Sequence, residues 1–283
     1  MPIEIQRSCY WSKCSFCDIN FAKNISTKKL NDVIEELKFY KSTYGINDFI
    51  IIDSAISPVF LDKFSEAIIK NKLNIKFFCD ARLEKQFTYK ILKKAYKAGL
   101  RCIGWGIESV NPRISALMNK NINIKEGIKV LKNSDKAGIW NNVYLMVGFP
   151  SETLEEAMGN IDFAKEHRNI MHSICLSRFN LLKYSEIYNH YSDFGINSID
   201  DTINFNLNVS YSSKCVMTND EVSALLEQFD KNIDIFYQSI VHNCYYSQYS
   251  QYLLRYSLRE IKRMYIKNKI FNMVKKFKLN SKK

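Results

Sequence analysis

The chain has 283 residues, of which 46% are hydrophobic and 25% are charged. This balance is typical of a folded globular protein and excludes a disordered chain. Its longest apolar runs, such as Phe49-Ile-Ile-Ile52, are far too short to span a bilayer, so we expect no membrane partner. Residues 1–8 lack an apolar stretch followed by a small-residue cleavage site, so we expect no signal peptide and a cytoplasmic protein.

The positive charge is concentrated at the carboxyl end of the chain. Residues 255–283 contain 11 Lys and Arg against one acid, Glu260, and hold +10 of the formal net charge of +12. Residues 253–278 have the pattern of a basic amphipathic helix. Such a tail packs as a solvated helix on the main domain, contacts an acidic partner or peptide, or binds nucleic acid, and its composition leaves all three open.

Short apolar strands alternate with amphipathic helices along the first 182 residues. The predicted strands are Ile3–Ile5, Phe49–Ile52, Ile75–Cys79, Cys102–Ile107, Val143–Val147 and Ile174–Phe179. The predicted helices are one capped by Ser26 or Thr27 and ended by Gly45, one after Pro58, one from Thr88 to Gly99, a short one after Pro112, and those over Ile124–Ala137 and Glu152–Glu166.

Six consecutive βα units favour a parallel sheet, either closed towards a barrel or open and doubly wound. No glycine-rich dinucleotide loop follows the first strand, so we predict an α/β fold, a partial (β/α)6 TIM-type barrel over residues 1–182 with a helical C-terminal extension. Residues 183–252 form a variable, substrate-side region with a helix that is capped by Asp220 and runs to about Gln238, and residues 253–283 form the basic amphipathic tail. The carboxyl ends of the strands are expected to carry the chemistry.

Three of the eight cysteines lie within nine residues, as Cys9, Cys14 and Cys17. Without an export signal, a disulfide framework is not expected. Three thiolates on one loop can each bind one iron of a 4Fe–4S cluster and leave the fourth iron open for a substrate or cofactor.

Zinc is the alternative metal for this loop, but a structural zinc site normally needs four Cys or His ligands. The sequence has no second Cys-x2-Cys, and its first histidine is His167, so zinc would have to recruit Asp18, Cys79 or Cys102. Together with the basic tail, this gives one alternative function, a zinc-stabilised nucleic-acid-binding protein.

The cysteine loop resembles that of the radical SAM superfamily, whose usual spacing is Cys-x3-Cys-x2-Cys with an aromatic residue before the last cysteine. Phe16 is that aromatic residue, and the resemblance places it beside the cofactor. The longer first spacing and Tyr10-Trp11 resemble the radical SAM domain of cobalamin-dependent radical SAM enzymes. Further similar motifs are Asp80-Ala-Arg82, Gly106-Ile-Glu-Ser109, Pro112-Arg113, Met118-Asn-Lys120 and Gly148-Phe-Pro-Ser-Glu-Thr153.

The resemblance implies a 4Fe–4S cluster on Cys9, Cys14 and Cys17 that binds S-adenosylmethionine and cleaves it reductively to a 5′-deoxyadenosyl radical. The radical would then modify an unknown small molecule or peptide, by methyl transfer or another rearrangement. The electron would come from a donor such as flavodoxin or ferredoxin. The residues that would act on the substrate itself stay unassigned.

The resemblance also predicts which strand ends contact S-adenosylmethionine. Asp53 or Ser54 could accept from the methionine ammonium, although Asp53 could instead cap the following turn. Arg82 could pair with the methionine carboxylate, and Glu108 could bond the ribose hydroxyls or the ammonium, with a buried ion pair to Arg82 as its alternative role. Met146 could line the adenine, or simply pack in the core.

Cobalamin-dependent relatives carry a cobalamin domain before the cysteine loop. Here the loop begins nine residues from the start and no Asp-x-His-x-x-Gly occurs, so we do not expect this chain itself to bind cobalamin. The second alternative function follows from this, namely a non-catalytic or split partner subunit that acts with a separate cobalamin-binding chain.

Overall fold

The structure is a computed structural model of the 283-residue chain. It describes residues 1–21, 25–202, 207–213 and 217–232, together with Glu260 and Arg263. The predicted basic tail, 253–283, and the end of the helix predicted to reach Gln238 therefore fall outside the described residues, apart from Glu260 and Arg263.

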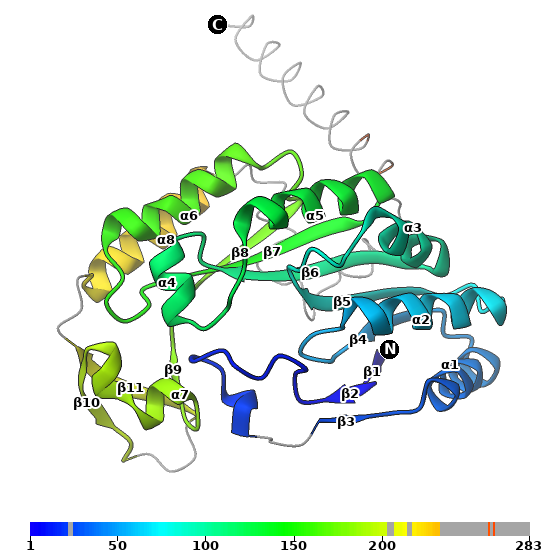
Figure 1. The fold of residues 1–283 in the computed structure, drawn as a ribbon, viewed down its shortest axis with the longest axis horizontal. Coiled ribbons are helices and arrows are strands. Elements are labelled where there is room, and N and C mark those ends of the chain that lie inside the picture. Colours follow the sequence, from blue (N-terminus) through cyan, green and yellow to red (C-terminus); the bar gives the residue numbers. More distant parts are fainter. Residues whose placement is uncertain (22–24, 203–206, 214–216, 233–259, 261–262, 264–283) are drawn as a thin grey trace, which may run out of the picture.

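Six parallel strands form one sheet, and each pairs with the next strand of the set (Figure 1). They are β1 (Pro2–Ile3), β4 (Asp48–Ile51), β5 (Lys76–Arg82), β6 (Leu100–Glu108), β7 (Trp140–Val147) and β8 (Ser173–Arg178). All five pairings are parallel, with a helical crossover in each connection. The prediction of an α/β fold with the strand order of a partial TIM-type barrel is confirmed.

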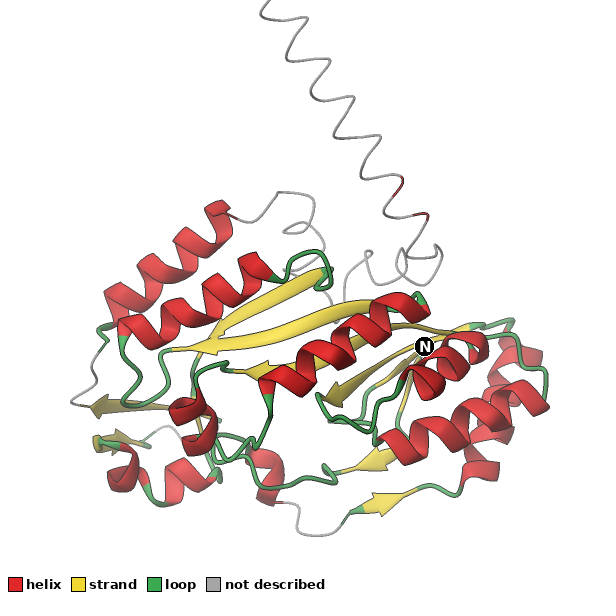
Figure 2. Cartoon of the chain, turned by 45° about the horizontal axis from the view of Figure 1, so that its top comes forward, coloured by secondary structure: helices red, strands yellow, loops and turns green. Residues whose placement is uncertain are grey.

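The helices of the repeat lie along one side of this sheet (Figure 2). They are α1 (Leu30–Tyr44), α2 (Pro58–Lys70), α3 (Tyr89–Ala98), α4 (Pro112–Leu117), α5 (Ile124–Ala137) and α6 (Leu154–Glu166). Side chains from all of these helices except α4 share one hydrophobic core with alternate strand residues, whereas Ile114 of α4 belongs to a second cluster. Within the described residues, no helix combines the length and apolar character needed to cross a bilayer.

Most helix ends use the signals expected from the sequence. Thr88 caps α3, Thr153 forms a capping box with Glu156 at the start of α6, and Gly45 ends α1 with a φ of 67°. The cap predicted for α1 is wrong, because Ser26 and Thr27 form the short strand β3 and pair with β2 (Gln6–Arg7). This pairing closes the base of the segment that carries the three cysteines.

A smaller unit follows β8. It contains β9 (Leu181–Leu182), α7 (Glu186–Asn189), the 3-10 turn η2 (Tyr191–Phe194), β10 (Ile196–Asp200) and β11 (Asn208–Ser213). Helix α8 (Asn219–Asn232) follows this unit and packs on the main core. Strands β10, β11 and β9 form an antiparallel sheet. The cap predicted for α8 is also wrong, since Thr218 rather than Asp220 accepts from the Glu221 amide, at 3.2 Å, and the Glu221 carboxylate accepts from the Thr218 amide in return.

The two faces of the parallel sheet differ in chemistry because neighbouring residues of a strand point to opposite sides. The face packed on the helices is apolar, with buried residues such as Ile103, Trp105, Val143 and Leu145. The other face, which we call the inner face, carries the alternate residues of β5 to β8. These are Asp80, Arg82, Gly104, Gly106, Asn142, Tyr144, Met146 and Cys175.

Candidate functional site

The cysteine loop connects β2 to the 3-10 turn η1 (Asp18–Phe21) and runs towards β9 and α7 (Figure 1). It is anchored at its centre by Ser15, whose amide donates to the Met118 carbonyl at 3.1 Å and whose carbonyl accepts from the Ile187 amide at 3.0 Å. The indole of Trp11 donates to the Asn119 carbonyl at 3.0 Å. The turn after α4 and the start of α7 therefore hold the loop beside the carboxyl ends of β5 and β6.

Cys9, Cys14 and Cys17 are partly buried and close enough to influence one another electrostatically. Burial raises the pKa of Cys14, and the nearby Lys120 and Arg82 cations oppose that rise. Burial raises the pKa of Cys17 to about 11, and the Cys14 and Cys9 thiols add to it. A bound cation would reverse these shifts, because metal ligation requires thiolates.

This donor set fits a 4Fe–4S cluster. Among the described residues, no three Cys, His, Asp or Glu side chains converge on one ion position. A cluster does not require such convergence, because each cysteine binds a different iron. Two cations beside Cys14 suit the negative charge that three thiolates would bring to the loop.

Glu108 ends β6 and forms an ion pair with Lys120 at 3.0 Å. Both side chains are nearly buried, and Gly106 leaves room for them, since a Cβ on Gly106 would lie 2.8 Å from the Glu108 Oε1 and 2.9 Å from the Lys120 Nζ. Burial alone would lower the pKa of Lys120, but the Glu108 carboxylate and the Cys14 thiol together outweigh it, and the pKa lies above its ordinary value. The alternative pairing of Glu108 with Arg82 is wrong, because Lys120 is the partner.

Arg82 lies at the end of β5 and is 4% exposed. Its Nε donates to Glu84 at 3.1 Å, one Nη donates to the Lys120 carbonyl at 2.7 Å, and the other faces the Cys14 Sγ at 3.9 Å. The guanidinium also stacks on the Trp11 ring, 3.8 Å from its centroid. These protein contacts occupy the group that the sequence analysis assigned to the methionine carboxylate.

Asp53 is buried near the start of the loop after β4, and Ser54 next to it is exposed. The Asp53 Oδ1 accepts from the Ile5 amide at 2.8 Å. Burial raises the pKa of Asp53, and hydrogen bonds from the Ile5 and Gln6 amides oppose the rise. The carboxylate therefore fastens the chain just before the cysteine loop to the second strand of the sheet.

Met146 and Phe16 pack against a second hydrophobic cluster at the carboxyl edge of the sheet. The fully buried members of this cluster include Met118, Phe149 and Phe179. Phe16 also lies under the Lys120 ammonium, 5.7 Å from its ring centroid. The structure thus brings Phe16, Met146, Arg82, Glu108 and Cys14 to one end of the barrel.

The sequence analysis assigned no role to Asp80 or Tyr144, which meet on the inner face. The Tyr144 hydroxyl donates to the Asp80 Oδ1 at 3.1 Å, reaching across β6 at Gly104. Burial raises the pKa of Asp80 to about 8, and the hydrogen bond from Tyr144 opposes the rise. The sequence feature that could have pointed to Asp80 is the Asp80-Ala-Arg82 motif, because residues two apart on a strand share one face and Asp80 therefore lies on the same face as Arg82.

Two motifs that carried the family resemblance have structural roles here. Arg113 forms a two-point ion pair with Glu156, at 2.7 and 2.5 Å, and donates to the Ser151 carbonyl at 2.7 Å. Glu152 accepts from the Gly148 amide at 2.7 Å, and burial raises its pKa to about 7 although this bond opposes the rise. Both motifs fix the turn between β7 and α6.

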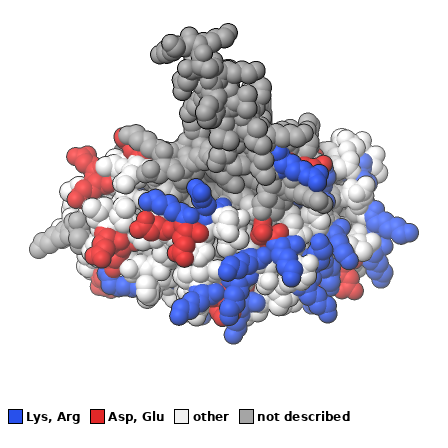
Figure 3. Space-filling model, turned by 90° about the horizontal axis from the view of Figure 1, so that it is seen from above, with Lys and Arg blue, Asp and Glu red and all other residues white. Residues whose placement is uncertain are grey.

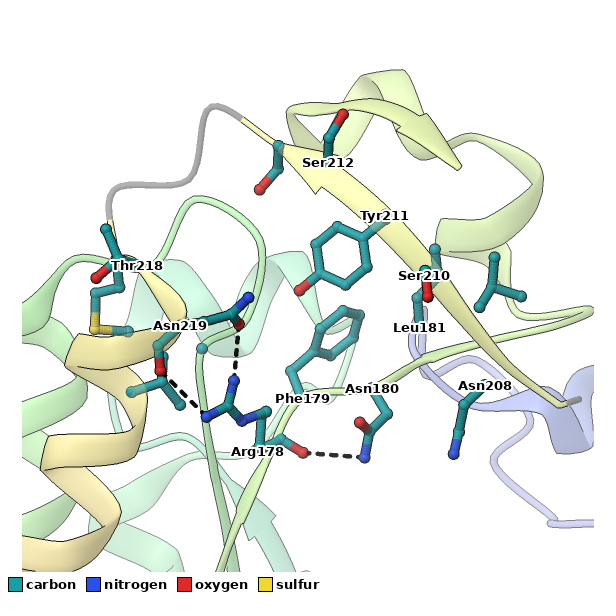
Figure 4. Close-up of a pocket in the computed structure, with 15 residues that line it drawn as sticks. Arg178, Phe179, Asn180, Leu181, Asn208, Ser210, Tyr211, Ser212, Thr218 and Asn219 are labelled. Carbon is teal, nitrogen blue, oxygen red and sulfur yellow. Dashed lines mark hydrogen bonds between the residues drawn. The ribbon is translucent and has the colours of Figure 1, made fainter. Parts of the chain in front are cut away.

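A cavity of about 500 Å³ lies between the end of β8, strand β11 and the start of α8 (Figure 4). Hydroxyl and amide groups line much of it, including Asn180, Ser210 and Ser212. Arg178 donates to Asn219 at 2.7 Å and to Ser223 at 2.7 Å, so α8 fixes its guanidinium. The cavity thus lies where the chain after the six βα units meets the ends of β7 and β8, because Gly148 and Arg178 also line it.

Charged residues are unevenly spread over the helical side of the molecule. Figure 3 shows Lys and Arg side chains gathered mainly over the end that carries α2 and α3, with Asp and Glu among them. Helix α3 alone contributes four lysines: Lys90, Lys93, Lys94 and Lys97. Lysines and acids are thus mixed on the described part of this surface.

Comparison with known proteins agrees with this geometry. Residues 3–164, more than half of the chain, match the Radical SAM superfamily. An uncharacterized methyltransferase of Pyrococcus horikoshii is 30% identical over 167 residues, which cover 56% of this chain and 35% of that protein. The chain therefore spans about a third of the length of this relative.

Solved structures show the same fold. The radical S-adenosylmethionine methyltransferase TsrM from Kitasatospora setae, with tryptophan substrate and a SAM analog bound, superposes with a TM-score of 0.66 at 16% identity, over 82% of this chain and 51% of that one. The cobalamin-dependent S-adenosylmethionine radical enzyme OxsB, with aqua-cobalamin and S-adenosylmethionine bound, gives 0.63 at 14% identity, over 93% and 49%. With its cysteine loop, its six βα units and the match over residues 3–164, the chain belongs to the radical SAM superfamily.

Proposed function

We propose that the chain binds a 4Fe–4S cluster through Cys9, Cys14 and Cys17 and uses it to cleave S-adenosylmethionine reductively. When bound, the cluster supplies an open iron for the methionine end and the electron that breaks a carbon–sulfur bond of the sulfonium. The observation that carries this proposal is the position of Cys14 beside the buried Arg82 and Lys120, at the carboxyl ends of the parallel strands.

Glu108 is our strongest candidate for a direct contact to S-adenosylmethionine. Lys120 holds its carboxylate at 3.0 Å, which restricts its rotamers in the absence of ligand. One oxygen faces the ammonium of Lys120, and the remaining lone pairs can accept from ribose hydroxyls or from the methionine ammonium. Preorganisation of this kind lowers the entropy cost of binding.

Phe16 and Met146 are proposed to form the apolar side of the adenine pocket, because both pack against the cluster of apolar side chains next to Lys120. Ser54 remains a candidate for the methionine ammonium, since its side chain is exposed at a strand end. Asp53 is a weaker candidate than its sequence position suggested, because its Oδ1 already accepts from the Ile5 amide.

The reaction that follows the cleavage is proposed to be methyl transfer to a small molecule or peptide. The relative from Pyrococcus horikoshii and the structural neighbour from Kitasatospora setae are both described as methyltransferases. Residues 183–252 would supply the substrate side, and the cavity beside β11 borders this region. A flavodoxin or ferredoxin would deliver the electron, and a separate cobalamin-binding subunit would join if methyl transfer uses cobalamin.

Anaerobic reconstitution with iron and sulfide tests the proposal. The wild-type protein should bind iron and sulfide in equal amounts and form 5′-deoxyadenosine from S-adenosylmethionine with a strong reductant. Cys9→Ala should abolish both. Cys102→Ala is the matched control, because Cys102 is buried on the sheet away from the loop and its loss should leave both unchanged.

Two results would redirect the proposal. Zinc in place of iron would favour a zinc-stabilised nucleic-acid-binding protein. An intact cluster without 5′-deoxyadenosine would favour the split-subunit alternative, particularly if turnover appears after addition of a copurifying cobalamin-binding chain.

A further inference from the structure

Arg82 is held in one orientation by three groups from three separate segments of the chain. Glu84 accepts from its Nε at 3.1 Å, and the Lys120 carbonyl accepts from one Nη at 2.7 Å. The ring of Trp11 covers one face of the guanidinium at 3.8 Å. Because the guanidinium is planar and rigid, these contacts also determine where its remaining Nη points.

That remaining Nη points at Cys14, and its distance to the Sγ is 3.9 Å. This is within the range of a hydrogen bond to sulfur, whose large radius lengthens such contacts. The side chain is only 4% exposed, so water competes little for this donor. Hydrogen bonds to ligating sulfurs, and the burial around them, are among the levers by which a protein sets the potential of an iron–sulfur cluster.

We propose that Arg82 is a positioning residue that raises the reduction potential of the cluster through its N–H···S contact with Cys14, and that Trp11 locks it in place. This inference rests on the proposed function, because it requires a cluster on Cys14. It gives Arg82 a different role from that of a partner for the methionine carboxylate. A donor to a ligating sulfur stabilises the additional negative charge of the reduced cluster more than that of the oxidised one.

Substitution of the neighbouring Glu84 distinguishes the effect of the hydrogen bond from the effect of charge. Its carboxylate neutralises the guanidinium at 3.1 Å and is 22% exposed. Removing Arg82 deletes the donor to sulfur and leaves this carboxylate close to the cluster, and both changes make reduction harder. Removing only the charge of Glu84 leaves the cation and the donor in place, and should make reduction easier.

The experiment is a redox titration of the reconstituted cluster, followed by the electron paramagnetic resonance signal of its reduced form, without S-adenosylmethionine. Arg82→Gln should lower the ratio of reduced to oxidised cluster at a fixed potential at least tenfold, which is 59 mV for one electron. Glu84→Gln should raise that ratio. Trp11→Ala should lower it by a smaller factor, because the guanidinium is no longer held against the loop.

Arg101 provides the matched control. It is also a partly buried arginine that stacks on an aromatic ring, Tyr96 at 4.5 Å, and donates to two backbone carbonyls, but it lies at the amino end of β6. Arg101→Gln should leave the potential unchanged. If Arg82→Gln does not fold, Arg82→Lys replaces it, since a lysine keeps the charge but loses the directed fork of donors.

The outcomes separate this inference from the proposed function. Failure of the wild-type protein to assemble any cluster would overturn the proposed function and this inference with it. If the wild-type protein assembles a cluster and the folded Arg82 variants have the same reduction potential as the wild type, this inference alone is overturned. Shifts of the same sign in the Arg82 and Glu84 variants would also overturn it, because they would reflect a general loosening of the loop.

Discussion

Replacing Lys120 by methionine should leave the Glu108 carboxylate without its ion-pair partner. The charged atoms lie 3.0 Å apart, and the side chains are 8% and 13% exposed. At an effective dielectric constant of about 20, their attraction is roughly 5 to 6 kcal/mol. Removing one partner of a buried pair costs about 3 to 5 kcal/mol, and Glu108 keeps some contact with solvent, so we expect Lys120→Met to lower the free energy of unfolding by about 3 kcal/mol.

The assay is urea unfolding of the metal-free protein near neutral pH, followed by circular dichroism. The double variant Lys120→Met/Glu108→Gln should recover most of the loss, because no unpaired charge remains buried. Lys129→Met is the control, since the Lys129–Glu126 pair is even shorter, at 2.7 Å, but its side chains are 68% and 39% exposed. That variant should change stability by less than about 0.5 kcal/mol.

The reasoning would be refuted if Lys120→Met unfolded at the same urea concentration as the wild-type protein. It would also be refuted if the two substitutions acted additively, because an ion pair in contact must show coupling in a double-mutant cycle. Either result would mean that solvent, rather than Lys120, satisfies the Glu108 carboxylate, and would weaken Glu108 as a preorganised cofactor contact.

Three further predictions follow from other contacts. Burial raises the pKa of Asp80 to about 8 from 3.8, so the folded protein keeps a proton that the unfolded chain releases. Stability should therefore fall as the pH rises from about 4 to 8, and urea unfolding of Asp80→Asn should show a smaller fall. Gly104→Ala should lower the melting temperature by several degrees, equivalent to about 2 kcal/mol, because its Cβ would lie 2.0 Å from the Asp80 Oδ1 and 2.6 Å from the Tyr144 hydroxyl; an unchanged melting temperature would contradict this contact. Arg113→Met should cost about 1 kcal/mol near neutral pH. Arg113 is the main cause, with Thr153 beside it, that lowers the pKa of Glu156 to about 2 from 4.5, so the unfolding curves of the two proteins should converge as the pH falls through this range.

The βα order could be predicted because each element carries its own periodicity. Helix α3, for example, has its cap at Thr88, its apolar stripe and its terminal Gly99 within a dozen consecutive residues. Ser26 and Thr27 were misassigned because a hydroxyl residue before an apolar stripe suits a helix cap and a strand equally well. The partner that decides between them, Gln6–Arg7, lies 19 to 21 residues earlier in the chain.

The cysteines could be predicted because their spacing is local, whereas the pairings around them could not. The partner of Glu108 depends on a bulge in β6 after Gly106, on the positive φ of 66° at Glu108 itself, and on the turn that carries Lys120. Neither the bulge, nor the positive φ, nor the turn leaves a periodic pattern in the sequence. In the same way, a carboxylate at a strand end such as Asp53 looks available to a ligand until the fold brings the Ile5 amide to it.

The division between the two faces of the parallel sheet has a consequence for how such a protein can change. Successive residues of one strand have different neighbours. Trp105 and Val143 belong to the apolar core beneath the helices, whereas Gly104 and Tyr144 lie on the inner face and do not belong to that core. A mutational library confined to the inner-face positions of β5 to β8 would therefore leave intact the strand residues that pack against the helices, and its folding losses would come from tight positions such as Gly104. Natural divergence of activities on this scaffold can follow the same alternate register.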